Sequence, residues 1–225
     1  MAGIRAVIFD LDDTLYPEQS FVFSGYRAVA EAFRTQFGDP DETVAELTRI
    51  FRSQDRRLAF NALFERRGHP ADREAVQAMI DLYRSHAPTI ALYDDAEAAL
   101  TRLRKRFSLG IITDGAAVMQ ETKVAALGLR TRVDVVVLTD ELGPGFGKPH
   151  PRVFELMAER LAIDPTACVY VADNAAKDFV APNALGWMTI QIVRAHGVYR
   201  DTPAQGGGVP QKIVHSLDEI DAILT

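Results

Sequence analysis

The hydrophobic positions in the first 105 residues follow a helical spacing, apart from one short apolar run at residues 4–9 that predicts a strand. Apolar side chains that recur every three or four residues mark the buried face of an amphipathic helix. This spacing predicts four helices between about residues 17 and 90, and no strand between about residues 17 and 105. The positions expected on the buried faces are Tyr26, Val29, Ala30, Phe33 and Phe37, then Val44, Leu47 and Phe51, then Leu58, Ala62 and Leu63, and finally Val76, Met79, Ile80 and Tyr83.

From Asp94 onward the pattern changes to short apolar runs that alternate with helical segments. The expected strands are 107–113, 134–138, 168–172, 188–193 and 212–215, and the expected helices are 95–105, 116–127, 151–161, 176–185 and 217–224. Strands that alternate with helices of about a dozen residues are typical of a parallel, doubly wound α/β sheet. We therefore expect an α/β core domain over residues 1–16 and 91–225, and a smaller all-helical domain over residues 17–90.

Several of the expected strands end in residues that can do chemistry. Asp10 and Asp12 follow the first strand, Thr113 ends the second, Asp173 follows the strand at 168–172, and Lys148 lies in the loop after 134–138. In a doubly wound sheet, ligands bind in the crevice beyond the carboxyl ends of the strands. The predicted fold thus gathers five distant side chains in one crevice.

This set of side chains suits a phosphate ester held beside a divalent cation. Asp10 and Asp173, with a backbone carbonyl and water, offer the hard oxygen ligands that Mg²⁺ prefers. Lys148 adds a positive charge, Thr113 adds a hydroxyl donor, and backbone N–H groups of the loops can join them. One carboxylate can attack phosphorus, and the acid at position 12 can move the proton of the leaving oxygen.

Composition narrows the class of protein without naming a reaction. A net charge of −6 gives no reason to expect a nucleic-acid partner. No apolar stretch approaches the roughly 18 residues of a membrane span, and the N-terminus does not resemble a signal peptide. The single cysteine, Cys168, cannot form an internal disulfide and is expected to be a buried packing residue. We therefore expect a cytoplasmic protein that binds a small molecule, while its oligomeric state stays open.

Other features of the sequence have a structural interpretation. Asp13 is expected to be a solvated turn residue, and His150 a helix cap or spacer. The segment 195–210 contains three consecutive glycines and is expected to be a mobile surface loop, with an active-site flap as the alternative. Residues 52–57, RSQDRR, lie between two expected helices and form the predicted specificity loop of the helical domain.

Four motifs together resemble the haloacid dehalogenase-like phosphatase superfamily. They are FDLDDTLY, IITDG, GKPHPRVFE and YVADNAAKDF, in the family's order and at its spacing, and they span almost the whole chain. The resemblance implies a Rossmann-like core with a helical cap inserted after the first strand. It also implies Mg²⁺-dependent hydrolysis of a small phosphorylated metabolite, a sugar phosphate or a nucleotide monophosphate, through an aspartyl-phosphate. Such caps close over the substrate and exclude water.

The resemblance implies roles for individual residues. Asp10 would be the nucleophile and Asp12 the general acid and base, with Thr113 and Lys148 completing the catalytic set. The residues that would contact the phosphate are Leu11, Thr113, Asp114, Gly115 and Lys148. The groups that would hold Mg²⁺ are Asp10, the backbone carbonyl of Asp12, Asp173, and Asp178 as a further ligand or outer-shell support.

Two positions depart from the family's pattern. Asp114 stands where Asn is frequent, so its carboxylate is expected to point away from the phosphate or to meet a cation, and Ala172 replaces a frequent Gly. A phosphomutase on the same scaffold and a non-catalytic phosphate-binding module stay open as alternatives. A dehalogenase is disfavoured, because displacing a halide from carbon needs no proton donor and Asp12 is present.

Overall fold

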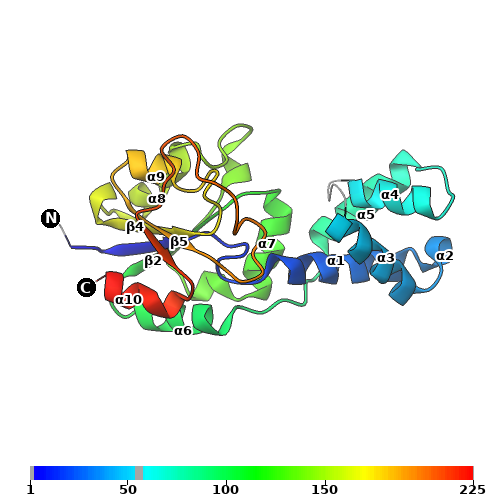
Figure 1. The fold of residues 1–225 in the computed structure, drawn as a ribbon, viewed down its shortest axis with the longest axis horizontal. Coiled ribbons are helices and arrows are strands. Elements are labelled where there is room, and N and C mark those ends of the chain that lie inside the picture. Colours follow the sequence, from blue (N-terminus) through cyan, green and yellow to red (C-terminus); the bar gives the residue numbers. More distant parts are fainter. Residues whose placement is uncertain (1–2, 54–57, 225) are drawn as a thin grey trace. The chain divides into compact units, whose positions relative to one another are not determined.

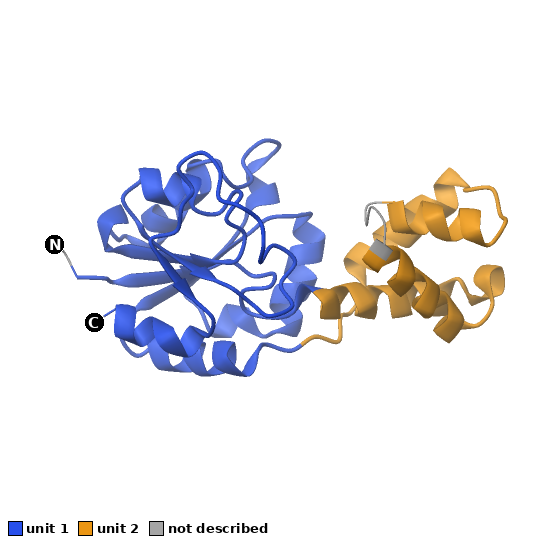
Figure 2. Cartoon of the chain, in the orientation of Figure 1, with its two compact units in different colours: residues 1–18, 91–225 blue, residues 19–90 orange. Residues whose placement is uncertain are grey.

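The computed structural model describes residues 3–53 and 58–224, and the chain divides into two compact units. Figure 2 colours them separately. The core unit comprises Met1–Glu18 and Ala91–Thr225, and the helical unit comprises Gln19–Ile90. Both segments of the core unit contribute strands to one sheet. The helical unit is therefore an insertion between these two segments of the sequence.

A six-stranded sheet, parallel throughout, forms the centre of the core unit (Figure 1). Its spatial order is β3-β2-β1-β4-β5-β6. The bounds are β1 (Ala6–Phe9), β2 (Ser108–Thr113), β3 (Val135–Leu138), β4 (Cys168–Ala172), β5 (Met188–Ile192) and β6 (Lys212–Val214). The predicted doubly wound parallel sheet is confirmed. Because the strand order reverses at β1, a ligand crevice is expected beyond the carboxyl end of this strand.

Helices cover both faces of the sheet. They are α6 (Asp94–Leu103), α7 (Ala117–Ala126), α8 (Arg152–Leu161), α9 (Val180–Ala184) and α10 (Ile220–Ile223). In Figure 1, α8 and α9 lie on one side of the sheet and α6 and α10 on the other. None of the helices in the described part of the chain is long and apolar enough to cross a membrane.

Aromatic packing fills the side of the sheet that α8 covers. The ring of Phe154 in α8 meets those of Tyr170 and Trp187 edge-on, with ring centroids 5.0 and 5.7 Å apart. Ile8 of β1 and the free thiol of Cys168 belong to the same buried cluster, as expected for Cys168. Each such large side chain contributes about 1.5–3 kcal/mol by its burial. This cluster therefore fixes β1, the strand that carries the first acids, against α8.

The helical unit contains its own apolar core. Its helices are α1 (Glu18–Ala32), α2 (Arg34–Phe37), α3 (Pro40–Ser53), α4 (Ala59–Arg66) and α5 (Arg73–Ser85), with α1 starting at the last residue of the core unit's first segment. Leu47, Leu63 and Met79, from three different helices, are fully buried in that core. Among the described residues between 17 and 105 no strand occurs, as predicted.

Some expected elements differ from those observed. The helix predicted through Phe37 breaks at Phe33, which separates α1 from α2. The helix predicted at 176–185 is short, because Asn174 forms a turn: its N–H donates to Asp178 and its side-chain oxygen accepts from the N–H of Ala176. The predicted helix 217–224 starts as a 3₁₀ turn, and only its second half is α-helical.

Two further expectations concern single residues and one loop. Leu58, expected on a buried face, is 56% exposed because it precedes the first turn of α4 and lies outside its packed stripe. His150 was expected to be a helix cap or spacer; the N-cap of α8 is Pro151, and His150, one residue earlier, accepts at its Nδ1 from the N–H of Arg152 at 3.1 Å. Of the predicted specificity loop 52–57, residues 54–57 lie outside the described residues.

Candidate active site

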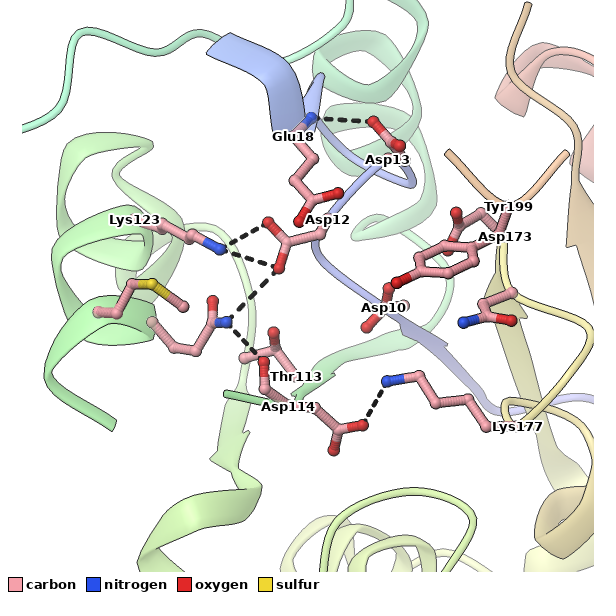
Figure 3. A pocket seen from close by; sticks show the side chains of 13 residues that line it. Asp10, Asp12, Asp13, Glu18, Thr113, Asp114, Lys123, Asp173, Lys177 and Tyr199 are labelled. Atoms are coloured by element: carbon pink, nitrogen blue, oxygen red, sulfur yellow. Dashed lines mark hydrogen bonds and ion pairs between the residues drawn. The ribbon is translucent and has the colours of Figure 1, made fainter. Parts of the chain in front are cut away.

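The carboxyl ends of β1, β2 and β4 meet at a cavity in the core unit. Phe9 in β1 is in register with Ile111 in β2 and with Val171 in β4. Asp10 is therefore level with the residues just before Thr113 and Asp173, and all three side chains line the same cavity. The cavity has a volume of about 170 Å³. Figure 3 shows its lining, which consists of Asp10, Asp12, Asp13, Glu18, Thr113, Asp114, Met119, Gln120, Lys123, Asp173, Asn174, Lys177 and Tyr199.

Lys148 lies behind this cavity rather than in its lining. Its side chain is 1% exposed, and its Nζ contacts Asp10 Oδ1 at 2.6 Å and Asp178 Oδ1 at 2.8 Å. It also donates to the hydroxyl of Tyr170 at 3.0 Å. Burial alone would lower the pKa of Lys148, but the two carboxylates outweigh burial and raise the pKa well above its usual value. Lys148 is therefore a fixed positive charge on the inner side of Asp10.

Three carboxylates form a compact acidic cluster at the same place. One oxygen each from Asp10, Asp173 and Asp178 lies within 4.8 Å of the others, and all three residues are buried. Burial raises the pKa of Asp10 to about 6, although Lys148 opposes the rise. Burial and the charges of Asp10 and Asp178 raise the pKa of Asp173 to about 9. Both raised pKa values indicate that the positive charge nearby does not fully offset the burial and mutual repulsion of these carboxylates.

Three buried side-chain oxygens of residues that line the cavity have no hydrogen-bond partner among the described residues. They are the hydroxyl of Thr113, Oδ2 of Asp173 and the amide oxygen of Gln120. Buried polar atoms are almost always paired, so an exception indicates a position for a ligand or ion. The donor set at Asp173 consists of hard carboxylate oxygens, which fits a hard divalent cation. The hydroxyl of Thr113 fits an anionic oxygen acceptor.

Asp12 points away from this cluster. Its two oxygens accept hydrogen bonds from Nζ of Lys123 at 2.7 and 2.9 Å, and Oδ1 also accepts from the hydroxyl of Tyr16. In Figure 3 the carboxylate faces Lys123, while Asp10 lies across the cavity. Burial would raise the pKa of Asp12, but Lys123 outweighs burial and lowers it. Any contribution of Asp12 to a cation beside Asp10 would therefore come from its backbone, as the resemblance implies.

Asp114 forms an ion pair with Lys177. Contact with a cation was one of the two outcomes expected for it, the other being that its carboxylate points away from the phosphate. Its Oδ2 accepts from Nζ of Lys177 at 2.5 Å, and its Oδ1 accepts from Thr139 at 2.8 Å and from the N–H of Lys148 at 3.1 Å. Burial would raise the pKa of Asp114, but the charges of Lys148 and Lys177 lower it overall. Asp114 thus ties together the loops that follow β2, β3 and β4.

The remaining phosphate contacts implied by the resemblance are not in the lining of the cavity. Leu11 has a fully buried side chain, which leaves only its backbone for a ligand. Gly115 has a φ of 122°, and a Cβ at this position would lie 2.6 Å from the Gln120 amide nitrogen. Glycine is therefore required at position 115 for the close approach of α7.

Asp13 lies in a turn, as expected, but it is buried rather than solvated, and that part of the expectation is wrong. It is 2% exposed and has a φ of 51°. Its Oδ1 accepts from the N–H of Glu18 at 2.9 Å and its Oδ2 from the N–H of Val198 at 2.8 Å. The buried carboxylate joins the loop after β1 to the segment 195–210, and Tyr199 of that segment lines the cavity. The segment was expected to be a surface loop, and this contact with the cavity favours the flap alternative.

Sequence reasoning missed several residues of the site. Gln120 and Lys123 occur three residues apart in α7, where the side chains of both face the cavity and are almost fully buried. Two polar residues at apolar spacing beside Val124 are the signal that could have found them. Lys177 carried no such signal, because it lies in a turn that was expected to be helical.

Replacing Asp114 by Asn is expected to destabilise the core unit by about 1–2 kcal/mol at pH 7. The Asn keeps an acceptor but loses the ion pair with Lys177, whose one-third exposure allows water to screen it. The folded pKa of Asp114 is below the unfolded value of about 3.9, so its contribution is full above that value and disappears as the pH falls through the folded one. The destabilisation should therefore shrink in acid.

Urea unfolding followed by fluorescence tests this expectation, since the single tryptophan, Trp187, is buried in the core unit. Glu141→Gln is the matched control, because Glu141 is an exposed acid in the 3₁₀ turn after β3. Equal unfolding free energies for the two variants at pH 7 would contradict the role given to Asp114.

Comparison with known proteins agrees with this geometry. The family model of the haloacid dehalogenase-like hydrolases matches residues 4–186. The glyceraldehyde 3-phosphate phosphatase of Methanopyrus kandleri is 32% identical over 92% of this chain and 91% of its own, and that of Methanocaldococcus jannaschii is 30% identical over 88% of each. The structure of the hydrolase YfnB from Bacillus subtilis shares the fold, with a TM-score of 0.70 at 21% identity over 100% of both chains. This chain belongs to the haloacid dehalogenase-like hydrolases.

Proposed function

We propose that this protein is a Mg²⁺-dependent phosphatase that hydrolyses a small phosphorylated metabolite through an aspartyl-phosphate on Asp10. One observation supports the proposal most strongly. The acidic cluster that contains Asp10 and the hydroxyl of Thr113, which has no hydrogen-bond partner among the described residues, lie at the same cavity. A carboxylate beside a cation and a hydroxyl donor matches what phosphoryl transfer needs, which is mostly positioning and charge stabilisation.

The residues that would hold Mg²⁺ are Asp10 and Asp173, the backbone carbonyl of Asp12, and Asp178 as ligand or outer-shell support. The buried, unpartnered Oδ2 of Asp173 supports this assignment, as does the repulsion within the cluster. When bound, the cation would offset the negative charge of the phosphoryl group and of the carboxylates around it.

In the proposed reaction an oxygen of Asp10 attacks phosphorus. The bond from phosphorus to the leaving oxygen breaks, and that oxygen takes a proton from the protonated form of Asp12, which must bind this proton before the step because Lys123 favours the ionised form. In the second half, water attacks the aspartyl-phosphate and gives a proton back to Asp12, and the bond from phosphorus to Asp10 breaks. Lys148 keeps Asp10 in place throughout, through the 2.6 Å contact of its Nζ with Oδ1.

A sugar phosphate or a nucleotide monophosphate is the proposed substrate class. The names of the two archaeal relatives reported above support the smaller end of this class, because both are phosphatases of a three-carbon sugar phosphate. The small cavity of the core unit also suits a phosphoryl group with little of the leaving group.

Phosphate release should require both Mg²⁺ and Asp10. We expect the wild-type chain to release inorganic phosphate from at least one member of a panel of sugar phosphates, nucleotide monophosphates and small phosphorylated acids, with glyceraldehyde 3-phosphate included. EDTA and, separately, Asp10→Asn should abolish release, because they remove the cation and the nucleophile. A colorimetric phosphate assay measures it.

Circular dichroism on Asp10→Asn controls for folding in this experiment. Release that persists in this variant would contradict the mechanism. Transfer of phosphate between positions of a sugar phosphate without release, by a folded chain, would support the phosphomutase alternative instead.

Asp12→Asn should separate metal binding from turnover. Its carboxylate faces Lys123 rather than the acidic cluster, so Mg²⁺ affinity measured by calorimetry should stay within a few-fold of the wild type. Turnover should fall by about 10²–10⁴-fold, the usual contribution of a general acid or base. Loss of Mg²⁺ binding comparable to that of Asp173→Asn would place the Asp12 side chain in the metal site and would contradict this assignment.

Asp173→Asn should raise the thermal midpoint measured without metal and remove the increase that Mg²⁺ causes. The substitution relieves the repulsion that Asp10 and Asp178 exert on Asp173, and it deletes a proposed ligand. Differential scanning fluorimetry with MgCl₂, and with NaCl of equal ionic strength, provides the measurement. An equal Mg²⁺-dependent increase in wild type and variant would count against the metal site.

A further inference from the structure

The carboxylate of Asp12 is fixed on the far side of the cavity from Asp10. Both of its oxygens accept hydrogen bonds from Nζ of Lys123, and Tyr16 donates to Oδ1. Gln120 lies at the edge of hydrogen-bonding distance from Oδ2, at 3.5 Å. Figure 3 shows Lys123 and Asp12 pointing toward one another, with Asp10 beyond them.

Burying the ammonium group of Lys123 beside Asp12 costs free energy. Its side chain is 2% exposed, although it comes from α7, a helix on the outside of the sheet. A buried ammonium group loses its hydration, and only close partners with good geometry compensate that loss. Two contacts below 3 Å with one carboxylate provide such geometry.

In-line displacement at phosphorus sets a requirement that this arrangement meets. The attacking and leaving oxygens lie on opposite sides of phosphorus, so the nucleophile and the proton donor must also be apart. Asp10 and Asp12 are separated by one residue, and the cation proposed beside Asp10 would attract the carboxylate of Asp12 to the wrong side. A fixed positive charge on the opposite wall prevents this.

We propose that Lys123 is a positioning residue that holds the Asp12 carboxylate on the leaving-group side of the cavity, with Tyr16 as its second support. This inference rests on the proposed function. Lys123 acts through Asp12: it holds the carboxylate in place, and the protonated form of Asp12 gives its proton to the leaving oxygen as the bond from phosphorus to that oxygen breaks. The competing explanation is that Lys123, which lines the cavity, binds the phosphoryl group itself.

The leaving group distinguishes these two roles. The p-nitrophenolate ion leaves without a proton, whereas the alkoxide of a sugar phosphate needs one. Because kcat/KM reports the steps up to alcohol release, misplacing Asp12 should lower kcat/KM for an alkyl ester and affect an aryl ester little. Loss of a direct phosphate contact should lower kcat/KM for both esters equally.

The experiment compares Lys123→Met and Lys123→Arg with wild type on p-nitrophenyl phosphate and on glyceraldehyde 3-phosphate. For Lys123→Met we expect kcat/KM to fall about 10- to 100-fold on the sugar phosphate, a part of the 10²–10⁴-fold range for a general acid, and less than about 3-fold on the aryl ester. Lys123→Arg should restore part of the loss. Inhibition by inorganic phosphate should be unchanged. Lys105→Met, at an exposed lysine of the core unit, is the matched control.

Two further variants keep the inference falsifiable if Lys123→Met folds poorly. Tyr16→Phe removes one support of Asp12 with little change in packing and should give a smaller loss with the same substrate selectivity. In the Asp12→Asn background, Lys123→Met should cause no further loss on the sugar phosphate, because Lys123 acts through Asp12.

Equal losses on both esters, with weaker inhibition by phosphate, would overturn the inference in favour of direct phosphate binding. Unchanged kinetics for Lys123→Met and Tyr16→Phe would also overturn it. If the wild-type chain hydrolyses another alkyl phosphate of the panel above but not glyceraldehyde 3-phosphate, that ester takes its place in the comparison. If the wild-type chain releases phosphate from no member of the panel, the proposed function fails and this inference fails with it, whereas an active wild type with equal losses on both esters overturns this inference alone.

Discussion

The repulsion among buried carboxylates at the carboxyl ends of β1 and β4 is the constraint on which the site depends. Asp10, Asp173 and Asp178 lie close enough for burial and mutual repulsion to raise the pKa of Asp10 to about 6 and that of Asp173 to about 9. Such a group persists in a folded chain only when positive charge compensates it or a proton neutralises one of its members. Lys148 provides this charge from the inner side, and the open side is where a cation fits.

Three acids of the site each contact a different lysine, and Lys148 contacts Asp178 as well as Asp10. The lysines come from three different connections of the sheet, so each carboxylate is held from a different direction. The pairs are Asp10 with Lys148, Asp12 with Lys123, and Asp114 with Lys177. Separate partners allow neighbouring acids of the same chemical type to differ in orientation and in protonation, which a single shared cation would not achieve.

The sheet and the main acids of the site could be predicted because local patterns encode them. Apolar runs ending in Asp10, Thr113 and Asp173 indicate both the strands and the rim where they meet. The partners could not be predicted, because they depend on which faces of α7 and of the turn after β4 point inward. Asp13 was misjudged for the same reason, since its second partner, the N–H of Val198, is far away in sequence.

The position of β1 at the centre of the sheet has a consequence for the order of folding. β1 pairs with β2 at residues 108–111 and with β4 at residues 168–171, so its partners follow it by more than a hundred residues of chain. The contacts of the helical unit, in contrast, close within Gln19–Ile90. Contacts between residues far apart in sequence form later, because they close larger loops and their partners are synthesised later. The inserted helices can therefore form before β2 and β4 have been synthesised and can pair with β1. A ribosome-bound chain would therefore complete the part of the molecule that lacks the acidic cluster before the part that contains it.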